Sequence, residues 1–297
     1  MAPPSADYAQ LAYDRVADAY DDLFFGHVTG PNARVTRELA LEPGERVADL
    51  ACGTGAVTVD MAHQVAPGEV VGVDWSEGML AGARERARAE DVRLHLVHAR
   101  AEDFVSRAEA RSFDVVSMRF VLAYLDWRSV LPRLGRMLRP GGRVGLLTSL
   151  STSVPQLCEL YHRFRKSPGP AWKLFQHTNR NLGQTWRIYR ELRETYGDDG
   201  FITVPDSTAE VARYLAAGGL RPAQSFTEQV RLWFDSGAEA VGWMHDSGYV
   251  THSSLQQVSP LALRFLQSLF AAGMETFREA PGVPLDLVVG GVIARRE

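Results

Sequence analysis

The most restrictive feature of the chain is segment 46–55, Arg-Val-Ala-Asp-Leu-Ala-Cys-Gly-Thr-Gly. Its apolar stretch at 47–50 is typical of a short buried strand, and the small residues after it are typical of a turn before a helix that begins near Val57. Gly53 and Gly55 allow a ligand to approach the backbone, and the first turn of the helix offers free N–H groups. The segment therefore predicts a nucleotide-binding turn.

A second apolar strand is predicted at residues 70–73, and it ends in Asp74. A carboxylate about twenty residues after the glycine turn can accept hydrogen bonds from both hydroxyls of a ribose. We expect Trp75 and Met79 to flank the adenine ring, because an aromatic side chain next to that carboxylate can stack on a base. The two strands together predict a nucleoside site.

The sequence also narrows the choice of nucleotide. A dinucleotide fingerprint needs a third small residue three positions after the second glycine, and this chain has Thr58 there. No Gly-Lys-Ser/Thr follows the turn, which excludes a P-loop. A dehydrogenase is therefore a weak alternative for this chain.

The order Asp-x-Ala-x-Gly-x-Gly followed by Asp74 resembles the first two motifs of the class I S-adenosylmethionine-dependent methyltransferases. Further segments match at similar spacing: Ala-Arg-Ala-Glu-Asp-Phe at 99–104, Phe-Asp-Val-Val-Ser at 113–117 and Leu-Arg-Pro-Gly-Gly at 138–142. Residues 13–21, Tyr-Asp-Arg-Val-Ala-Asp-Ala-Tyr-Asp, resemble the entry helix of the ubiquinone/menaquinone-type small-molecule subgroup. The resemblance covers residues 10–150 and implies S-adenosylmethionine as the cofactor.

The resemblance implies roles for five residues outside the glycine turn. Asp49 would help to hold the methionine amino end of the cofactor. Tyr13 and Tyr20 would either reach the methionine carboxylate or pack on the face of their helix. Arg119 and Tyr124 lie where the family lines the methyl-transfer mouth, which makes both candidates for the substrate side. We also assign Arg119 to the cofactor and Tyr124 to catalysis.

The chain departs from the family pattern at two positions. Ala51 replaces the first glycine of the turn, which costs little unless that residue needs a positive φ. Arg100 stands where an acidic side chain commonly accepts from the adenine amino group, and arginine cannot accept a hydrogen bond. We therefore expect adenine recognition to rest on the Ala101 backbone and on Glu102.

Apolar spacing predicts one helix over residues 8–25 and another over 129–138, which the Pro-Gly-Gly sequence at 140–142 would end. Apolar runs predict further strands at 113–118 and 143–149. Strands that alternate with helices at this spacing predict parallel βαβ units.

The resemblance implies an α/β, Rossmann-like class I methyltransferase sheet of seven strands, mostly parallel, with the last strand antiparallel. We expect a helical cap over the cofactor at 1–40, the cofactor-binding core at 41–150, a core helix and strand at 206–234, and a final core strand at 285–297. Two insertions, 151–205 and 235–284, would form a mainly helical lid around the substrate pocket.

The first insertion is basic, with eight basic residues and one acidic residue between positions 163 and 193. Lys173, Arg180 and Arg187 recur on one face of a helix predicted at 171–196. Arginine forks in this place could hold an anionic substrate. A solvated helix face is the more common cause of such a pattern, and an oligomer contact through the lid helices is the third alternative.

Two histidines of the insertions, His177 and His245, are candidate general bases, because imidazole titrates near neutral pH. Tyr124 is the third catalytic candidate. A structural role is the more common one for any single histidine. No metal site is expected, since Cys52 and Cys158 are far apart and no other group has ligand spacing.

Composition excludes several kinds of partner. The net charge of −4 gives no reason to expect nucleic acid. No apolar run approaches the ~18 residues of a membrane span, and the N-terminus lacks the pattern of a secretion signal. The chain has two cysteines, which favours a reducing cytoplasm over a disulfide framework.

These observations predict a cytoplasmic S-adenosylmethionine-dependent methyltransferase that acts on a small molecule, in bacterial specialised metabolism. Two alternatives use the same cofactor motifs. One is a methyltransferase fold with other chemistry, such as a cyclase, and the other is a non-catalytic scaffold that binds or has lost the cofactor. Arg100 is the feature that favours the scaffold.

Overall fold

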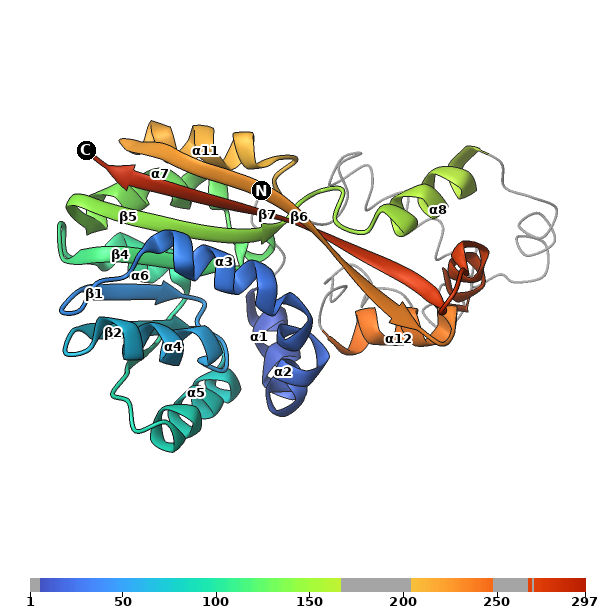
Figure 1. The fold of residues 1–297 in the computed structure, drawn as a ribbon, viewed down its shortest axis with the longest axis horizontal. Coiled ribbons are helices and arrows are strands. Elements are labelled where there is room, and N and C mark those ends of the chain that lie inside the picture. Colours follow the sequence, from blue (N-terminus) through green and yellow to red (C-terminus); the bar gives the residue numbers. More distant parts are fainter. Residues whose placement is uncertain (1–5, 167–203, 248–266, 269) are drawn as a thin grey trace. The chain divides into compact units, whose positions relative to one another are not determined.

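The computed structural model describes residues 6–166, 204–247, 267–268 and 270–297 (Figure 1). Within them, seven strands form one sheet in the order β3-β2-β1-β4-β5-β7-β6. The strands from β3 to β5 are parallel, and β7 is antiparallel to β5. The predicted mostly parallel sheet with an antiparallel last strand is confirmed. The strands are β1 Arg46–Leu50, β2 Glu69–Asp74, β3 His95–His98, β4 Phe113–Arg119, β5 Leu138–Ser149, β6 Leu220–Phe234 and β7 Val283–Arg296.

Helices precede, connect and follow these strands. They are α1 Ala6–Val16, α2 Tyr20–Leu23, α3 Thr29–Leu39, α4 Ala56–Val65, α5 Glu77–Ala89, α6 Ala101–Arg107, α7 Trp127–Met137, α8 Pro155–Lys166, α11 Thr208–Ala217 and α12 Gly237–Asp246. Short 3₁₀ turns lie at Ala17–Ala19, Phe25–Val28, Leu122–Tyr124 and Glu275–Phe277. In the described residues, none of the helices is both long and apolar enough to cross a membrane.

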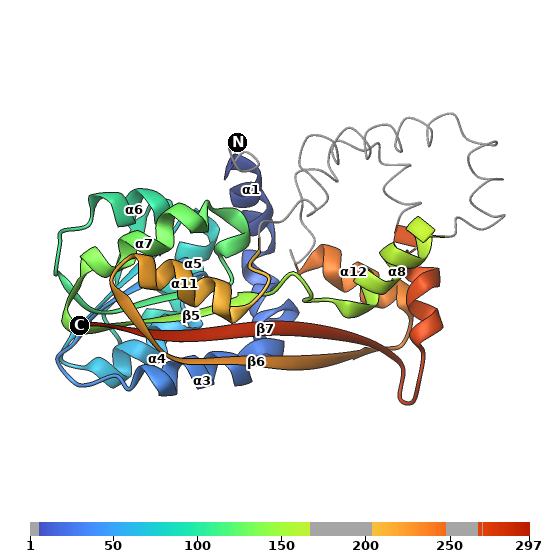
Figure 2. The same cartoon turned by 90° about the horizontal axis from the view of Figure 1, so that it is seen from above.

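The sheet is covered on both faces, because successive side chains of a strand point in opposite directions. Val47 packs in a cluster with α3 and α4, whereas the next residue, Ala48, packs in a cluster with α6, α7 and α11. Figure 2 shows these two groups of helices on opposite sides of the strands. Such a three-layer arrangement leaves the carboxyl ends of the parallel strands as the edge where ligands bind.

Two elements differ from their prediction. The helix expected at 8–25 is interrupted by the 3₁₀ turn at Ala17–Ala19, where Ala17 lies against Gly78 of α5. Strand β5, expected to begin at Arg143, begins at Leu138. The Pro-Gly-Gly sequence that was expected to end a helix instead forms an irregular start of β5, with a shift of register against β4 between Phe113 and Val115.

The chain divides into two compact units. Unit 1 comprises residues 1–151, 204–228 and 288–297, and unit 2 comprises 152–203 and 229–287. Unit 2 contains α8 and α12, which belong to the two segments predicted as a lid. The helix predicted at 171–196, with its basic face, lies outside the described residues. The role of these segments as a lid stays a prediction.

Unit 2 contains a buried ionic network around Asp286, which is 4% exposed. Its carboxylate accepts hydrogen bonds from Arg231 Nε at 2.6 Å, Arg231 Nη2 at 2.9 Å and Gln156 Nε2 at 2.8 Å. Burial acts to raise the pKa of Asp286, but the hydrogen bonds from Arg231, Gln229 and Gln156 outweigh it and leave the pKa below its usual value. The charged carboxylate is therefore the form that stabilises the fold.

Replacing Asp286 with Asn is expected to lower the free energy of unfolding by about 2 kcal/mol at neutral pH, because charge-assisted hydrogen bonds are lost. Because the pKa of Asp286 is lower in the folded state, its carboxylate stabilises the fold at pH values above its unfolded pKa, about 3.9. This stabilisation is lost as the pH falls further. Wild type and variant should thus converge in acid, as measured by denaturant unfolding at several pH values. Glu279→Gln is the control, since Glu279 pairs with Arg231 at 3.2 Å on the surface. A difference that does not change with pH would contradict the prediction.

Candidate functional site

The glycine turn after β1 adopts left-handed backbone at Ala51, Gly53 and Gly55, with φ values of 60°, 56° and 78°. Gly55 precedes α4 as its N-cap, and a Cβ there would lie 2.9 Å from the Cβ of Ala83. Both the backbone angle and the close packing on α5 therefore require glycine at position 55. At Gly53 a Cβ would meet no atom within 4 Å, which leaves that side of the turn open.

Ala51 has a positive φ, and at such a backbone angle an alanine in place of the family's glycine lowers the stability of the fold. A left-handed residue other than glycine costs about 1–2 kcal/mol, whereas glycine adds ~0.4–1 kcal/mol of entropy to the unfolded chain. We expect Ala51→Gly to raise the free energy of unfolding by up to about 1 kcal/mol. Ala81→Gly, on the exposed side of helical α5, should lower it by about 1 kcal/mol. Thermal or denaturant unfolding tests this contrast, and two changes of the same sign would contradict it.

Asp74 ends β2 and joins it to the glycine turn. Its Oδ2 accepts from Gly53 N at 2.8 Å, and its Oδ1 accepts from Ser76 N at 2.9 Å. Burial raises the pKa of Asp74, and the backbone hydrogen bonds from Ser76, Gly53 and Trp75 oppose that shift. Each carboxylate oxygen has further acceptor capacity, which is what a pair of ribose hydroxyls requires.

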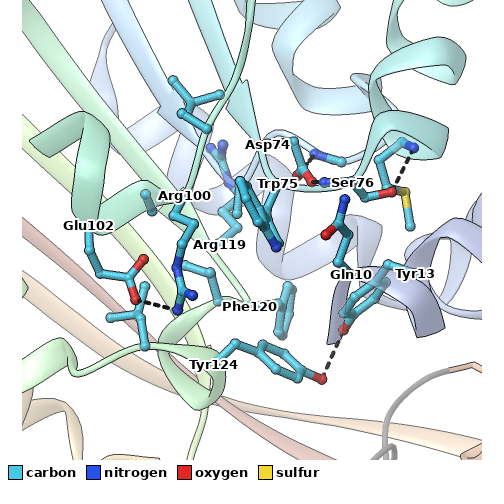
Figure 3. Close-up of a pocket in the computed structure, with 18 of the residues that line it drawn as sticks. Gln10, Tyr13, Asp74, Trp75, Ser76, Arg100, Glu102, Arg119, Phe120 and Tyr124 are labelled. Carbon is cyan, nitrogen blue, oxygen red and sulfur yellow. Dashed lines mark hydrogen bonds and ion pairs between the residues drawn. The ribbon is translucent and has the colours of Figure 1, made fainter. Parts of the chain in front are cut away.

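Asp74 lies in a cavity of unit 1 at the carboxyl ends of β1, β2 and β4 (Figure 3). The cavity brings together most of the predicted site residues: Tyr13, Tyr20, Ala51, Gly53, Asp74, Trp75, Met79, Ala101, Glu102, Arg119 and Tyr124. Asp49 and Gly55 are outside its lining. Asp49 is buried in β1, where its Oδ2 accepts from Thr58 Oγ1 at 2.6 Å.

The described residues of unit 1 that line this cavity include no histidine. His245 belongs to α12 of unit 2, where its side chain is half exposed and Nδ1 lies 3.1 Å from Asp246 Oδ1. His177 lies outside the described residues. Their catalytic assignment stays a prediction.

Several lining residues were not predicted as site residues, namely Gln10, Val73, Ser76, Ala99, Arg100, Phe120, Val121 and Leu125. For Ser76 the sequence did hold a signal, since a serine just before a helix is a good N-cap, and Ser76 Oγ accepts from Met79 N at 3.0 Å. Phe120 directly follows Arg119 at the end of β4. Gln10 had no distinguishing pattern.

Trp75 makes contacts within the protein that a residue serving only to stack on adenine would not need. One face of its indole stacks on His98, with ring centroids 5.2 Å apart and 23° between the planes. The guanidinium of Arg100 lies 6.0 Å from the Trp75 centroid and pairs with Glu102 at 3.5 Å. Among the described residues, the buried Trp75 Nε1 has no hydrogen-bond partner. Trp75 thus offers the cavity a donor as well as an aromatic surface.

Arg119 is a buried cation at the end of β4. Nη2 donates to Thr36 Oγ1 at 3.0 Å, Nη1 donates to Ser117 Oγ, and Nη1 lies 3.7 Å from Asp49 Oδ1. Burial lowers the pKa of Arg119, and the charge of Asp49 opposes that shift. Nε has no partner among the described residues. A buried donor of this kind at a cavity fits an anionic group of a ligand.

A group of phenols forms another wall of the cavity (Figure 3). Tyr13 Oη donates to Tyr124 Oη at 2.9 Å, and the ring of Tyr13 meets that of Tyr20 edge to face at 5.9 Å. Burial raises the pKa of both Tyr13 and Tyr20, and neighbouring phenols and Asp74 add to the shift. Tyr13 and Tyr20 therefore stay protonated at neutral pH and can orient a ligand by hydrogen bonding or packing.

The sheet order, the glycine turn and the carboxylate at the end of β2 define a Rossmann-like nucleoside-binding fold of the methyltransferase type. A candidate methyltransferase from Bacillus halodurans shares this fold with a TM-score of 0.55 and 20% identity, covering 89% of this chain and 98% of that one. The (4+2)-cyclase SpnF shares it with a TM-score of 0.54 and 16% identity, covering 100% and 97%. At such identities the likeness concerns the fold.

Sequence comparison gives the family. Residues 47–142 match a methyltransferase domain. A demethylmenaquinone methyltransferase from Clavibacter sepedonicus is 30% identical over 224 residues, which are 71% of this chain and 89% of the relative. Another, from Lactobacillus johnsonii, is 29% identical over 217 residues, 68% and 87% of the two chains. The chain belongs to the class I S-adenosylmethionine-dependent methyltransferases, as its motifs predicted. It is an enzyme of that class, with S-adenosylmethionine as its cofactor.

The cavity fits this cofactor. Asp74 would hold the ribose, and Trp75 and Met79 would lie at the adenine. Arg119 Nε, which has no partner among the described residues, and the nearby Asp49 would face the charged amino-acid end. When bound, the cofactor supplies an electrophilic methyl group on its sulfonium. In the part of the chain that the structure describes, no cluster of three or more histidine, cysteine, aspartate or glutamate side chains could hold a metal ion.

Proposed function

We propose that the chain methylates a small, largely apolar acceptor that binds at the aromatic end of the Asp74 cavity. One observation carries the proposal: the same cavity joins Asp74 and Gly53 to Phe120, Val121, Tyr124 and Leu125. A nucleoside-binding end and an apolar end in one cavity suit a cofactor and an acceptor with an apolar body. The named acceptor of the relatives, demethylmenaquinone, is a small molecule, which supports this class of substrate.

The residues around the cavity would act mainly by positioning. The Asp74 carboxylate is fixed by two backbone N–H groups, and Tyr13 and Tyr124 hold each other through their hydroxyls. Apolar side chains at the aromatic end would exclude water from the reacting atoms. Alignment of two bound reactants can supply ~7–11 kcal/mol of the barrier in favourable cases.

An acceptor that must lose a proton needs a group to receive it. Protonated phenols with raised pKa values are poor bases, so Tyr13 and Tyr20 remain proposed as contacts of the cofactor's methionine carboxylate rather than as proton acceptors. We propose Tyr124 as the side chain that contacts the acceptor at the reacting end. His177 and His245 remain proposed as bases supplied by the segments predicted as a lid.

We extend the proposal to a cytoplasmic role in specialised metabolism. The chain has only two cysteines, Cys52 and Cys158, and this low count supports a reducing compartment. An anionic acceptor and an oligomer contact, both suggested by the basic stretch at 163–193, are subsidiary proposals. Gel filtration tests the oligomer, and comparison of acceptors with and without a carboxylate tests the charge.

The function is tested by incubating the purified protein with methyl-labelled S-adenosylmethionine and a panel of quinols, phenols and carboxylated analogues. The expected result is a product that gains one labelled methyl group and that forms at least about tenfold more slowly with the Asp74→Ala variant when the cofactor is below saturation. A product of the same mass as its precursor would show cyclase-type chemistry instead. Cofactor binding without a change in any acceptor would contradict the proposed acceptor class.

A further inference from the structure

Helix α1 lines the nucleoside site with Gln10 and Tyr13, and it also contacts the start of α5 through the carboxylate of Asp14. Asp14 Oδ1 accepts a hydrogen bond from Ser76 Oγ and another from Gly78 N at 3.1 Å. Asp14 itself is not part of the cavity lining. It therefore reaches the start of α5 from behind the wall of the cavity.

Ser76 connects this contact to the cavity. Its backbone N–H donates to Asp74 Oδ1 at 2.9 Å, and its Oγ accepts from Met79 N at 3.0 Å. Ser76 is 2% exposed, so water cannot replace these partners without rearrangement. Any displacement of Ser76 must move the N–H group that orients the Asp74 carboxylate. Asp14, Ser76 and Asp74 thus form a chain of hydrogen bonds.

Packing holds α1 against the same point. A Cβ on Gly78 would lie 3.2 Å from Asp14 Cα and 3.3 Å from Ala17 Cβ, which is tighter than ordinary van der Waals contact. The helix backbones therefore approach closely because position 78 has no side chain. This close approach is what lets the short side chain of Asp14 reach both Ser76 and Gly78.

A second carboxylate of the N-terminal segment binds the other side of the nucleoside site. Asp21 Oδ1 accepts from Thr54 Oγ1 at 2.6 Å, and its Oδ2 accepts from Arg86 Nη2. Arg86 Nε also donates to the carbonyl of Thr54 at 3.2 Å. Thr54 lies in the glycine turn, next to Gly53 that donates to Asp74. The N-terminal segment thus contacts the side chains of Ser76 and Thr54, one in each of the two loops whose backbone N–H groups fix the Asp74 carboxylate.

We propose that Asp14 is a positioning residue of the cofactor site, which acts through Ser76 on the Asp74 carboxylate. The inference rests on the proposed role of Asp74 as the ribose ligand. Asp14, in the segment before β1, would then contribute to cofactor affinity without contacting the cofactor. A structural role alone would stabilise α1 without any selective effect on the ligand.

The test measures the dissociation constant of S-adenosylhomocysteine by calorimetry for wild type and Asp14→Ala. Loss of a charge-assisted hydrogen bond, and with it the fixed position of Ser76, should weaken binding about tenfold. Asp14→Asn keeps an acceptor oxygen without the charge and should weaken it about threefold. Asp18→Ala is the control, because Asp18 is exposed one turn further along and makes the same change of charge. Equal affinity of Asp14→Ala and wild type would overturn the inference.

A double-mutant cycle with Asp74→Ala separates positioning from a general loss of structure. If Asp14 acts through Asp74, replacing Asp14 should have little further effect, less than about twofold, once the carboxylate is gone. An undiminished effect in the Asp74→Ala background would overturn the inference. If Asp14→Ala does not fold, Asp14→Asn takes its place in the cycle. An Asp74→Ala variant with wild-type affinity would instead refute the ribose assignment, so the two failures are distinguishable.

Discussion

Replacing Asp74 with Ala is expected to weaken the binding of S-adenosylmethionine and S-adenosylhomocysteine by about tenfold to a hundredfold. In the proposed role the carboxylate would accept the ribose hydroxyls, and a hydrogen bond to a charged group contributes about 1.5–3 kcal/mol, where 1.4 kcal/mol is tenfold in affinity. Calorimetric titration measures the effect. Asp103→Ala, an exposed aspartate of α6 outside the cavity lining, is the control. Unchanged affinity would remove the ribose assignment.

The geometry also predicts that Asp74→Asn cannot restore binding. Both oxygens of Asp74 already accept a backbone N–H, from Gly53 and from Ser76. An amide has one acceptor oxygen, and its NH₂ group would face one of these donors. The affinity of the Asn variant for the cofactor should therefore exceed that of Asp74→Ala by no more than about threefold. Wild-type affinity in the Asn variant would show that the negative charge is not needed.

Replacing Arg119 with Met is expected to lower the free energy of unfolding by about 3 kcal/mol or more, since removal of one partner from a buried ion pair leaves the other charge uncompensated. Asp49 lies 3.7 Å from Arg119 and keeps the hydrogen bond from Thr58. The hydroxyls of Ser117 and Thr36 lose a donor as well. Denaturant unfolding measures the loss.

The double variant Arg119→Met with Asp49→Asn is the matched control, because it removes the uncompensated charge. It should be more stable than Arg119→Met, while both bind S-adenosylhomocysteine more weakly than wild type through loss of the donor at Nε. A loss of less than about 1 kcal/mol in Arg119→Met would mean that the pair contributes as little as an exposed salt bridge.

The elements that the sequence predicted well are those with local signals. Apolar runs at β1, β2 and β4 located the sheet, and Gly53 and Asp74 located the point where the strands end in a cavity. The glycine at 55 was expected from the small-residue turn, and its left-handed backbone agrees with that local signal. Such features depend on residue type and spacing, which the sequence shows directly.

Other features of the site depend on tertiary contacts. Phe120 has a φ of 52°, a rare angle for a bulky residue, and its N–H donates to the carbonyl of Leu147 on the next strand at 2.8 Å. The stacking of Trp75 on His98 likewise joins the ends of β2 and β3. No local pattern in the sequence encodes either arrangement. The sequence indicated only that a positive φ at Ala51 would have a cost. It could not show that the angle is positive, because alanine gives no sign of left-handed backbone.

The N-terminal segment shows the same limit. Its apolar spacing predicted one helix, but the 3₁₀ turn at Ala17–Ala19 divides it. The carboxylates on its two sides, Asp14 and Asp21, then contact loops at Ser76 and Thr54, which are more than thirty residues away in the chain. Helix periodicity reports which face is apolar, and it cannot report which distant hydroxyl a carboxylate will accept from.

The most direct test of the central claim is calorimetric titration of the purified protein with S-adenosylmethionine, S-adenosylhomocysteine and NAD in separate experiments. The site geometry predicts micromolar binding of the two sulfur ligands and no binding of NAD. Binding of NAD, or binding of none of the three, would contradict the assignment of the Asp74 cavity to S-adenosylmethionine.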